Sequence, residues 1–293
     1  MEGKCILFKE LGEVNAVPIV LDTQDTDALV NIVTNLAPSF GGINLEDISA
    51  PRCFEVEDRL QDIGIPVFHD DQHGTAIVVL AGLMNALKVV NKPLTGVRIV
   101  VSGAGASAIA CAKMLALAGA TNTVLVDRQG AIHLERSDLT APKQEIARLM
   151  NPGGLTGDVH QVLEGADVFL GLSGPGLLNA DDIRRMAPDP VVFAMANPVP
   201  EIMPDEAFAG GAAVVATGRS DFPNQVNNVL AFPGIFRGAL SVRAPRITPE
   251  MRMAAAVALA EMVEEPHAKE ILPSALDRSV AVRIGEAAAA VYR

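Results

Sequence analysis

The chain has 293 residues, more than one hydrophobic core usually holds, so two domains are expected. Hydrophobic residues make up 49% of the chain and charged residues 20%, which excludes a disordered protein. The formal net charge of −12 argues against nucleic acid or an anionic membrane as a partner. An anionic substrate would need local positive charge, and a bound metal ion can supply it.

Compartment signals are few. No basic segment followed by an apolar one opens the sequence, so no signal peptide is predicted. The longest apolar stretch, residues 76–90, is interrupted by polar residues and is too short to span a bilayer. The three cysteines lack the spacing of a metal site and suit a reducing compartment. We therefore predict a cytoplasmic protein whose cysteines are small buried hydrophobic residues.

The first seventy residues alternate between two patterns. Apolar runs bounded by Gly, Asn or Asp predict short strands at Lys4–Lys9, Val17–Leu21, Ile43–Asp47 and Ile65–Phe68. Helical spacing of apolar residues predicts helices at Thr26–Pro38, capped by Asp25 or Thr26, and at Arg52–Ile63. Strands that alternate with helices indicate a parallel sheet with helical crossovers.

A second alternating series follows an apolar helix. The helix is predicted from Gly74 to Val90, and the series continues with strand Val97–Ser102, helix Ala106–Ala118, strand Thr123–Asp127 and further units to about Ala216. After Phe232 the pattern becomes helical, at Thr248–Val263 and Ala275–Tyr292. We predict an α/β protein with a Rossmann-like, doubly wound dinucleotide-binding domain at 75–227. Residues 1–74 and 228–293 are expected to form a second α/β domain together.

A glycine-rich loop joins the predicted strand at Val97–Ser102 to the following helix. Gly103 permits a tight turn, Gly105 lets the backbone approach a pyrophosphate, and Ala108 permits close packing of helix on strand. Asp127 ends the next strand, where an acidic residue can hold the adenosine ribose hydroxyls of NAD. Arg128 immediately follows and could pair with the 2′-phosphate of NADP, so the two cofactors remain open. A glycine turn without a nucleotide is the alternative.

Two groups of carboxylates follow predicted strands. Glu46 and Asp47 end one strand, and Asp70 and Asp71 end another. The carboxyl ends of parallel strands share one edge of a sheet, so these groups should converge and could bind Mg²⁺ or Mn²⁺. Helix N-capping is the simpler alternative. Lys4 is a candidate base if burial lowers its pKa, although an exposed lysine is the commoner case.

Five separated motifs carry a family resemblance. They are LEDI at 45–48, FHDDQHGTA at 68–76, SGAGA at 102–106, ANPVPE at 196–201 and TGRSDFPNQVNNVLAFPGIFRGAL at 217–240. In this order the chain resembles the malic enzyme family, in its small bacterial type, over essentially its whole length. The resemblance implies oxidative decarboxylation of (S)-malate to pyruvate and CO₂ with NAD⁺ or NADP⁺, a Mg²⁺ or Mn²⁺ requirement, and a homodimer or larger assembly.

The resemblance also implies roles for single residues. Those matched to metal ligands are Glu46, Asp47 and Asp71, with Asp70 beside them in the catalytic site. Lys4 matches the general base. The residues matched to the cofactor site are Gly103, Gly105, Ala106, Ala108, Asp127 and Asn197. Those matched to substrate contacts are Asn197, Asn227 and Asn228.

Two parts of the family pattern have no counterpart here. The family's final proton donor is a tyrosine ahead of the lysine motif, and a substrate-binding arginine also precedes that lysine. The one tyrosine of this chain is Tyr292, in unmatched surroundings. We therefore expect an N-terminally truncated relative in which malate binding and protonation of the product are weakened. A malolactic enzyme that releases lactate, and a non-catalytic protein that binds NAD or metal, are the alternatives.

Overall fold

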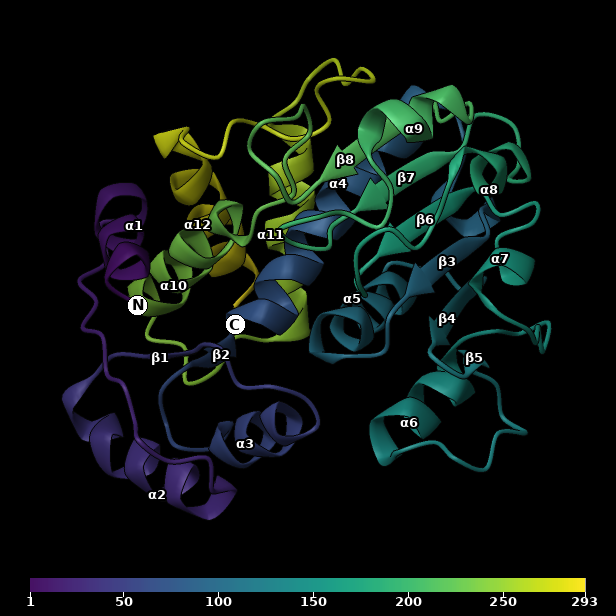
Figure 1. Cartoon of the computed structure of the whole chain (residues 1–293). Coiled ribbons are helices and arrows are strands. Elements are labelled where there is room, and N and C mark those ends of the chain that lie inside the picture. The colour runs from purple at the N-terminus through teal and green to yellow at the C-terminus, as the bar shows by residue number, and fades with distance from the viewer. Residues whose placement is uncertain (293) are drawn as a thin grey trace. The chain divides into compact units, whose positions relative to one another are not determined.

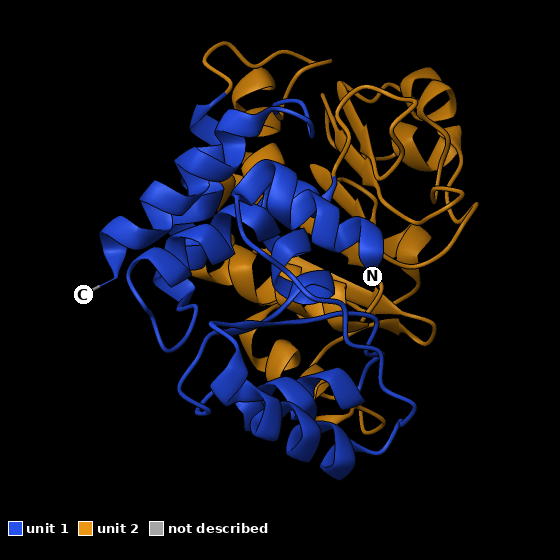
Figure 2. Ribbon diagram, turned by 90° about the vertical axis from the view of Figure 1, so that its left-hand side faces the viewer, with its two compact units in different colours: residues 1–78, 227–262, 273–293 blue, residues 79–226, 263–272 orange. Residues whose placement is uncertain are grey.

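The computed structural model describes residues 1–292, which form two compact units (Figure 2). Unit 1 contains residues 1–78, 227–262 and the described part of the C-terminal segment from Pro273; unit 2 contains 79–226 and 263–272. The segment Val263–Leu272 lies with unit 2, not with the chain ends as expected. Two hydrogen bonds hold it there: Asn224 Nδ2 donates to the Ala268 carbonyl (2.8 Å) and the Ile271 amide donates to Asn224 Oδ1 (3.1 Å).

Unit 2 is built around a six-stranded sheet with the order β5-β4-β3-β6-β7-β8 (Figure 1). Its strands are β3 Ile99–Ser102, β4 Thr123–Asp127, β5 Gly130–Ala131, β6 Val168–Gly171, β7 Val191–Ala194 and β8 Val214–Thr217. All neighbours pair in parallel except β4 and β5. Nearly every strand residue is buried, as expected of a parallel sheet covered on both faces.

Helices connect these strands. They are α4 Thr75–Val89, which begins in unit 1, η3 Leu94–Gly96, α5 Ala106–Leu117, α6 Ala141–Leu149, α7 Val159–Val162, α8 Ala180–Arg184 and α9 Pro204–Ala209. The chain leaves β3 toward β4 on one side and returns to β6 on the other. The strand order therefore switches between β3 and β6, where doubly wound sheets form their ligand crevice. The predicted Rossmann-like fold is confirmed.

Unit 1 is mainly helical. Its helices are α1 Glu2–Gly12, α2 Thr26–Leu36, η1 Ala37–Ser39, α3 Arg52–Leu60, the π-helical turn η2 Asp70–Gly74, η4 Asn228–Leu230, α10 Phe232–Ser241, α11 Pro249–Glu261 and α12 Arg278–Val291. Two short strands, β1 Ile43–Leu45 and β2 Val67–His69, pair in parallel. Asp25 caps α2 as predicted, because its carboxylate accepts a hydrogen bond from the Ala28 amide (2.8 Å).

The predicted strand at Lys4–Lys9 is wrong, because these residues lie in helix α1. Phe8 packs against Phe232 and Phe236 of α10, with ring centroids 4.7 and 5.4 Å apart. Residues four positions apart share one face of a helix, so burial of Phe8 also directs Lys4 to that face. Residues 4–9 have the apolar composition of a strand, but they form part of a helix whose Phe8 packs against α10.

The strand predicted at Val17–Leu21 is also absent. This segment has no regular structure, and Val17 and Val20 are 65% and 81% exposed.

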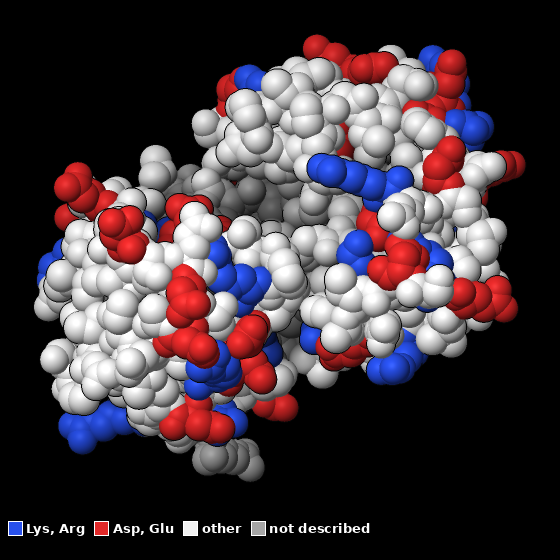
Figure 3. Space-filling model, turned by 60° about the horizontal axis from the view of Figure 1, so that its bottom comes forward, with Lys and Arg blue, Asp and Glu red and all other residues white. Residues whose placement is uncertain are grey.

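No described helix is long and apolar enough to cross a membrane. On the face seen in Figure 3, acidic and basic side chains lie interspersed, so the acidic excess of the sequence forms no separate patch there.

Candidate active site

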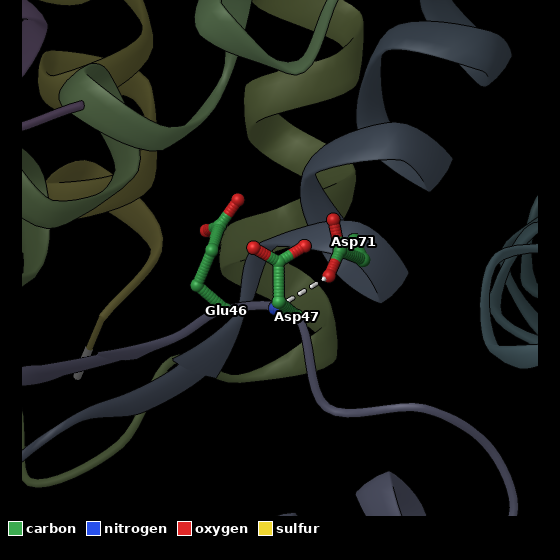
Figure 4. Close-up of side chains that lie close together, drawn as sticks. All are labelled: Glu46, Asp47 and Asp71. Carbon is green, nitrogen blue, oxygen red and sulfur yellow. Dashed lines mark hydrogen bonds between the residues drawn. The ribbon is translucent and has the colours of Figure 1, made fainter. Parts of the chain in front are cut away.

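Strand pairing in unit 1 brings the two predicted carboxylate groups together. Leu45 of β1 lies beside His69 of β2, so the residues that follow both strands emerge at one edge. Glu46, Asp47 and Asp71 lie close together (Figure 4), and one carboxylate oxygen from each lies within 4.8 Å of the other two. The cluster therefore joins a pair that is adjacent in sequence to a residue 24 positions away.

The backbone of Asp47 supports this arrangement. Its φ of 56° lies in the left-handed region, which is uncommon for residues other than glycine and often marks a functional site. In this conformation the Asp47 amide donates a hydrogen bond to Asp71 Oδ2 (3.1 Å) (Figure 4).

These three carboxylates fit a hard divalent cation. Their oxygens are close enough for one ion to bind, and oxygen ligands suit Mg²⁺ or Mn²⁺. Without a counterion, carboxylates this close repel one another. A pocket of about 490 Å³ in unit 1 is lined by Lys4, Glu46 and Asp47, so a small ligand can reach this edge.

Lys4 lies between two carboxylates. Its ammonium donates hydrogen bonds to Glu46 Oε2 and Asp70 Oδ2, and it sits 4.6 Å from the centre of the Phe232 ring. Burial alone would lower the pKa of Lys4, but the charges and hydrogen bonds of Asp70 and Glu46 outweigh it and raise this pKa. The expectation of a lowered pKa for Lys4 is therefore not met here.

Asp70 is fully buried beside Lys4. Burial raises the pKa of the Asp70 carboxyl to about 7, against the opposing influence of Lys4. Asn228 Nδ2 donates to Asp70 Oδ2 (2.5 Å), so a residue 158 positions away enters the same site. The partly exposed Lys4 and the fully buried Asp70 therefore form an ion pair.

Gly74 was not singled out by the sequence, yet it shapes this pair. A Cβ atom at Gly74 would lie 1.9 Å from Asp70 Oδ1 and 3.3 Å from Cβ of Asn228. Only glycine leaves room for the Asp70 carboxylate at this position. This need for glycine arises from the conformation of the π-helical turn, so the sequence alone does not reveal it.

Asn227 is placed differently from Asn228. Its side-chain oxygen accepts a hydrogen bond from the Val229 amide (3.0 Å) and caps η4. The oxygen of Asn227 therefore supports the local turn, whereas the amide of Asn228 reaches the buried carboxylate.

A buried polar network supports the turn that carries Asp70 and Asp71. Glu57 of α3 accepts hydrogen bonds from Gln72 Nε2 (3.0 Å) and binds His73 Nε2 (2.8 Å). Arg252 of α11 contacts the other ring nitrogen of His73. Burial alone would raise the pKa of Glu57. The hydrogen bond from His73 and the nearby cations outweigh burial and keep this pKa below its usual value. His73 is thus a hydrogen-bonding residue. Arg252 was missed because it lies 179 positions from His73, and Glu57 because nothing in its spacing shows that it turns toward this residue.

The glycine-rich loop of unit 2 has the predicted placement between β3 and α5. Gly103 has a φ of +115°, and a Cβ there would lie 2.4 Å from the Leu172 carbonyl oxygen. Gly105 has open space around its Cα and is the N-cap residue of α5. Ala106 begins the helix, and Ala108 is buried within it. The amides of this helix start can face an anion.

Asp127 ends β4, one strand away from this loop. Parallel pairing places Val126 opposite Ser102, so Asp127 lies level with Gly103. Its carboxylate is paired with Arg136 and Lys143, neither of which the sequence had indicated.

Asn197 follows β7 at the same edge of the sheet, where it is exposed. The buried carboxylate of Glu201 links two loops at this edge. It accepts hydrogen bonds from the amides of Ser173 (2.9 Å) and Ala196 (3.0 Å). Burial raises the pKa of Glu201. Glu201 thereby ties the loop after β6 to the loop that carries Asn197.

The fold and these groups define an α/β protein with a dinucleotide-type loop in one unit and a carboxylate site suited to a divalent cation in the other. Two family descriptions match the chain: "Malic enzyme, N-terminal domain" at residues 1–61 and "Malic enzyme, NAD binding domain" at residues 72–292. The chain belongs to the malic enzyme family.

Individual relatives agree with this. The NAD-dependent malic enzyme of Geobacillus stearothermophilus is 55% identical over the whole chain, and the bifunctional malic/malolactic enzyme of Bacillus subtilis is 51% identical over 99% of it. The crystal structure of the NAD-dependent malic enzyme of Thermotoga maritima matches 98% of this chain and 77% of its own, with 47% identity and a TM-score of 0.95. The chain spans 62% of the Geobacillus enzyme and 72% of the Bacillus enzyme.

Proposed function

We propose that this chain catalyses, or supplies most of the site for, the metal-dependent oxidative decarboxylation of (S)-malate to pyruvate and CO₂ with NAD⁺ or NADP⁺. The observation that carries the proposal is the adjacency of two groups in unit 1. One is the trio Glu46, Asp47 and Asp71, and the other is the Lys4–Asp70 pair. Family membership supplies the reaction class.

The trio would hold Mg²⁺ or Mn²⁺. When bound there, such an ion would act as a Lewis acid: it would make the 2-hydroxyl of malate more acidic and would polarise the C2 ketone, which favours loss of CO₂. The same charge would attract the two carboxylates of malate to a chain with an overall negative charge.

Lys4 is the proposed acceptor of the proton from the malate 2-hydroxyl. Its partner Glu46 also belongs to the trio, so a cation bound by Glu46 competes with the Lys4 ammonium for this carboxylate. The buried Asp70 then remains as the direct partner of Lys4 and can share its proton. Asn228 fixes the Asp70 carboxylate through its side-chain amide.

Unit 2 would bind the nicotinamide cofactor, which supplies the hydride acceptor. Gly103, Gly105, Ala106 and Ala108 form the proposed pyrophosphate site. Asn197 is the proposed contact at the nicotinamide end, because the loop after β7 lies at the carboxyl edge of the sheet.

The test is an absorbance assay of NADH or NADPH formation with malate and Mn²⁺, combined with quantification of pyruvate. We expect equal amounts of reduced cofactor and pyruvate. Asp71→Ala should abolish both, and the exposed Asp58→Ala, in helix α3 of the same unit, should leave them unchanged. Turnover that survives in Asp71→Ala, or an Mn²⁺-independent reaction, would refute the assignment of the trio.

A second candidate is malolactic activity, favoured by the similarity to the Bacillus subtilis enzyme named for both activities. In that reaction malate yields lactate and CO₂ without net reduction of the cofactor. Analysis of the products for pyruvate and lactate in the same assay separates the two candidates. Sedimentation of the purified chain would test the expected homodimer.

A further inference from the structure

Glu57 lies on the buried face of helix α3, where an apolar side chain would be expected. Its neighbours on that face are Cys53, Val56 and Leu60, all of which are fully buried. A carboxylate in such a place costs free energy unless it is paired and hydrogen-bonded. The partners of Glu57 therefore indicate what this side chain does.

Three donors to the Glu57 carboxylate come from the segment around the π-helical turn η2. Oε1 accepts hydrogen bonds from the His69 amide (3.4 Å) and from His73 Nε2 (2.8 Å), and Oε2 accepts one from Gln72 Nε2 (3.0 Å). One carboxylate thus holds the residue before the two aspartates of this turn and the two residues after them.

The shape of this turn decides where the aspartates point. A π-helical turn is rare and is often found at functional sites. Its characteristic hydrogen bond runs from the Thr75 amide to the Asp70 carbonyl, five residues back. Asp71 extends from the turn toward Asp47 (Figure 4), so the place of its carboxylate depends on the turn. Hydrogen bonds to Glu57 on both sides of the aspartates restrain this shape.

Arg252 fixes the orientation of the His73 ring. A guanidinium can only donate, so its nearer contact, with Nδ1, requires that nitrogen to be unprotonated and to accept. Nε2 then carries the proton and donates a hydrogen bond to Glu57. The Phe68 ring lies against the same imidazole, with ring centroids 5.5 Å apart. His73 therefore joins Glu57 of α3 to Arg252 of α11 in one tautomer.

We propose that Glu57 is a positioning residue for the reaction: by holding the turn it sets the places of the Asp70 and Asp71 carboxylates. Arg252 assists by fixing the ring of His73. Glu57 lies outside the carboxylate trio, so it acts on the cation site without being a ligand. The inference rests on the proposed function only for the roles of the two aspartates.

The test measures two affinities on the full chain without malate: that for Mn²⁺ by calorimetry and that for NADH by its fluorescence. Glu57→Leu removes both acceptor oxygens at a similar side-chain size. We expect at least a tenfold loss of Mn²⁺ affinity, since loss of a residue that orients metal ligands costs about 10- to 100-fold. NADH affinity should not change, because the dinucleotide loop belongs to unit 2. In turnover, kcat should fall while the KM for the dinucleotide stays the same.

Two further variants grade the effect. Glu57→Gln keeps one acceptor oxygen, which can still serve His73, so it should retain more Mn²⁺ affinity than Glu57→Leu. Arg252→Met removes the donor to His73 Nδ1 and leaves Glu57 in place. Its Mn²⁺ affinity should fall between those of wild type and Glu57→Leu.

Two controls separate positioning from stability. Glu55→Gln changes an exposed carboxylate of the same helix, which pairs with Arg59, and it should leave Mn²⁺ affinity unchanged. Val280→Ala opens a cavity in the buried core of unit 1, at helix α12. It should lower the urea midpoint of unfolding without changing Mn²⁺ affinity.

Wild-type Mn²⁺ affinity in folded Glu57→Leu overturns the inference. So does an equal loss of Mn²⁺ affinity in Val280→Ala, because lowered stability would then explain both. If Glu57→Leu does not fold, wild-type Mn²⁺ affinity and kcat in Arg252→Met overturn it. Unchanged Mn²⁺ affinity in Asp71→Ala would instead refute the proposed metal site. A loss in Asp71→Ala together with wild-type affinity in Glu57→Leu contradicts only the positioning role.

Discussion

The two glycines of the dinucleotide loop should respond in opposite ways to the same added methyl group. Gly103 combines a φ of +115° with a backbone oxygen 2.4 Å from the position of a Cβ atom. Gly105 has an ordinary φ of −85° and nothing within 4 Å of its Cβ position. We therefore expect the fold to require glycine at position 103, and only the bound cofactor to require it at position 105.

The magnitudes follow from these geometries. In Gly103→Ala, the disfavoured backbone costs about 1–3 kcal/mol, and displacing the Leu172 carbonyl adds about 1–3 kcal/mol. Such a loss is a large part of the roughly 5–15 kcal/mol that stabilises a domain. In Gly105→Ala, poorer N-capping and reduced freedom of the unfolded chain nearly cancel, so stability should change by less than about 0.5 kcal/mol.

Binding should separate the variants further. The methyl group of Gly105→Ala occupies the space through which the backbone approaches a pyrophosphate, so we expect at least a tenfold loss of cofactor affinity in a stable protein. Unfolding is followed by far-ultraviolet circular dichroism in urea. Binding is followed by the change in NADH fluorescence. Equal destabilisation of both variants, or full cofactor affinity in Gly105→Ala, would refute the assignment of the two roles.

Three further substitutions test the remaining groups. Asp71→Ala should weaken Mn²⁺ binding at least a hundredfold in calorimetry, because it removes one of three clustered carboxylates; unchanged affinity would show that the ion binds elsewhere. Gly74→Ala should displace the Asp70 carboxylate and abolish turnover while circular dichroism still reports a helical protein; a fully active variant would contradict this packing. Asp127→Asn should cost about 1 kcal/mol at pH 7, since a pKa lowered from 3.8 to about 2 corresponds to roughly 2.5 kcal/mol before solvent screening. That stability is present above about pH 4 and is lost as pH falls toward 2, so urea unfolding of Asp127→Asn and wild type should converge there.

Local patterns in the sequence predicted unit 2 well. The strand at Thr123–Asp127 was predicted at its observed bounds, and helix Ala106–Ala118 ends one residue earlier in the structure. Buried parallel strands are short apolar runs between turn residues, and the glycine loop fixes where one of them ends. Both signals depend on neighbouring residues alone.

The surroundings of the site could not be predicted in this way. The Arg252 contact with His73 spans 179 residues, and the Asn228 hydrogen bond to Asp70 spans 158. Arg136 and Lys143 are closer to Asp127, but nothing in their spacing shows that both side chains turn toward it. The family resemblance supplied the candidate site residues, and it did not indicate Glu57, Arg136, Lys143 or Arg252, which hydrogen-bond around them.

Helix α1 shows why this limit affects the chemistry. An alternating strand would have sent Lys4 and its neighbours to opposite faces, whereas the helix places Lys4 above the buried Phe8. Phe8 has its aromatic partners on α10, more than two hundred residues away, so the packing of this helix face depends on distant residues. The ammonium of Lys4 then rests near the Phe232 ring and reaches both carboxylates. The position of the proposed base therefore depends on core packing between α1 and α10, and a change in that core should move Lys4 without touching any charged residue.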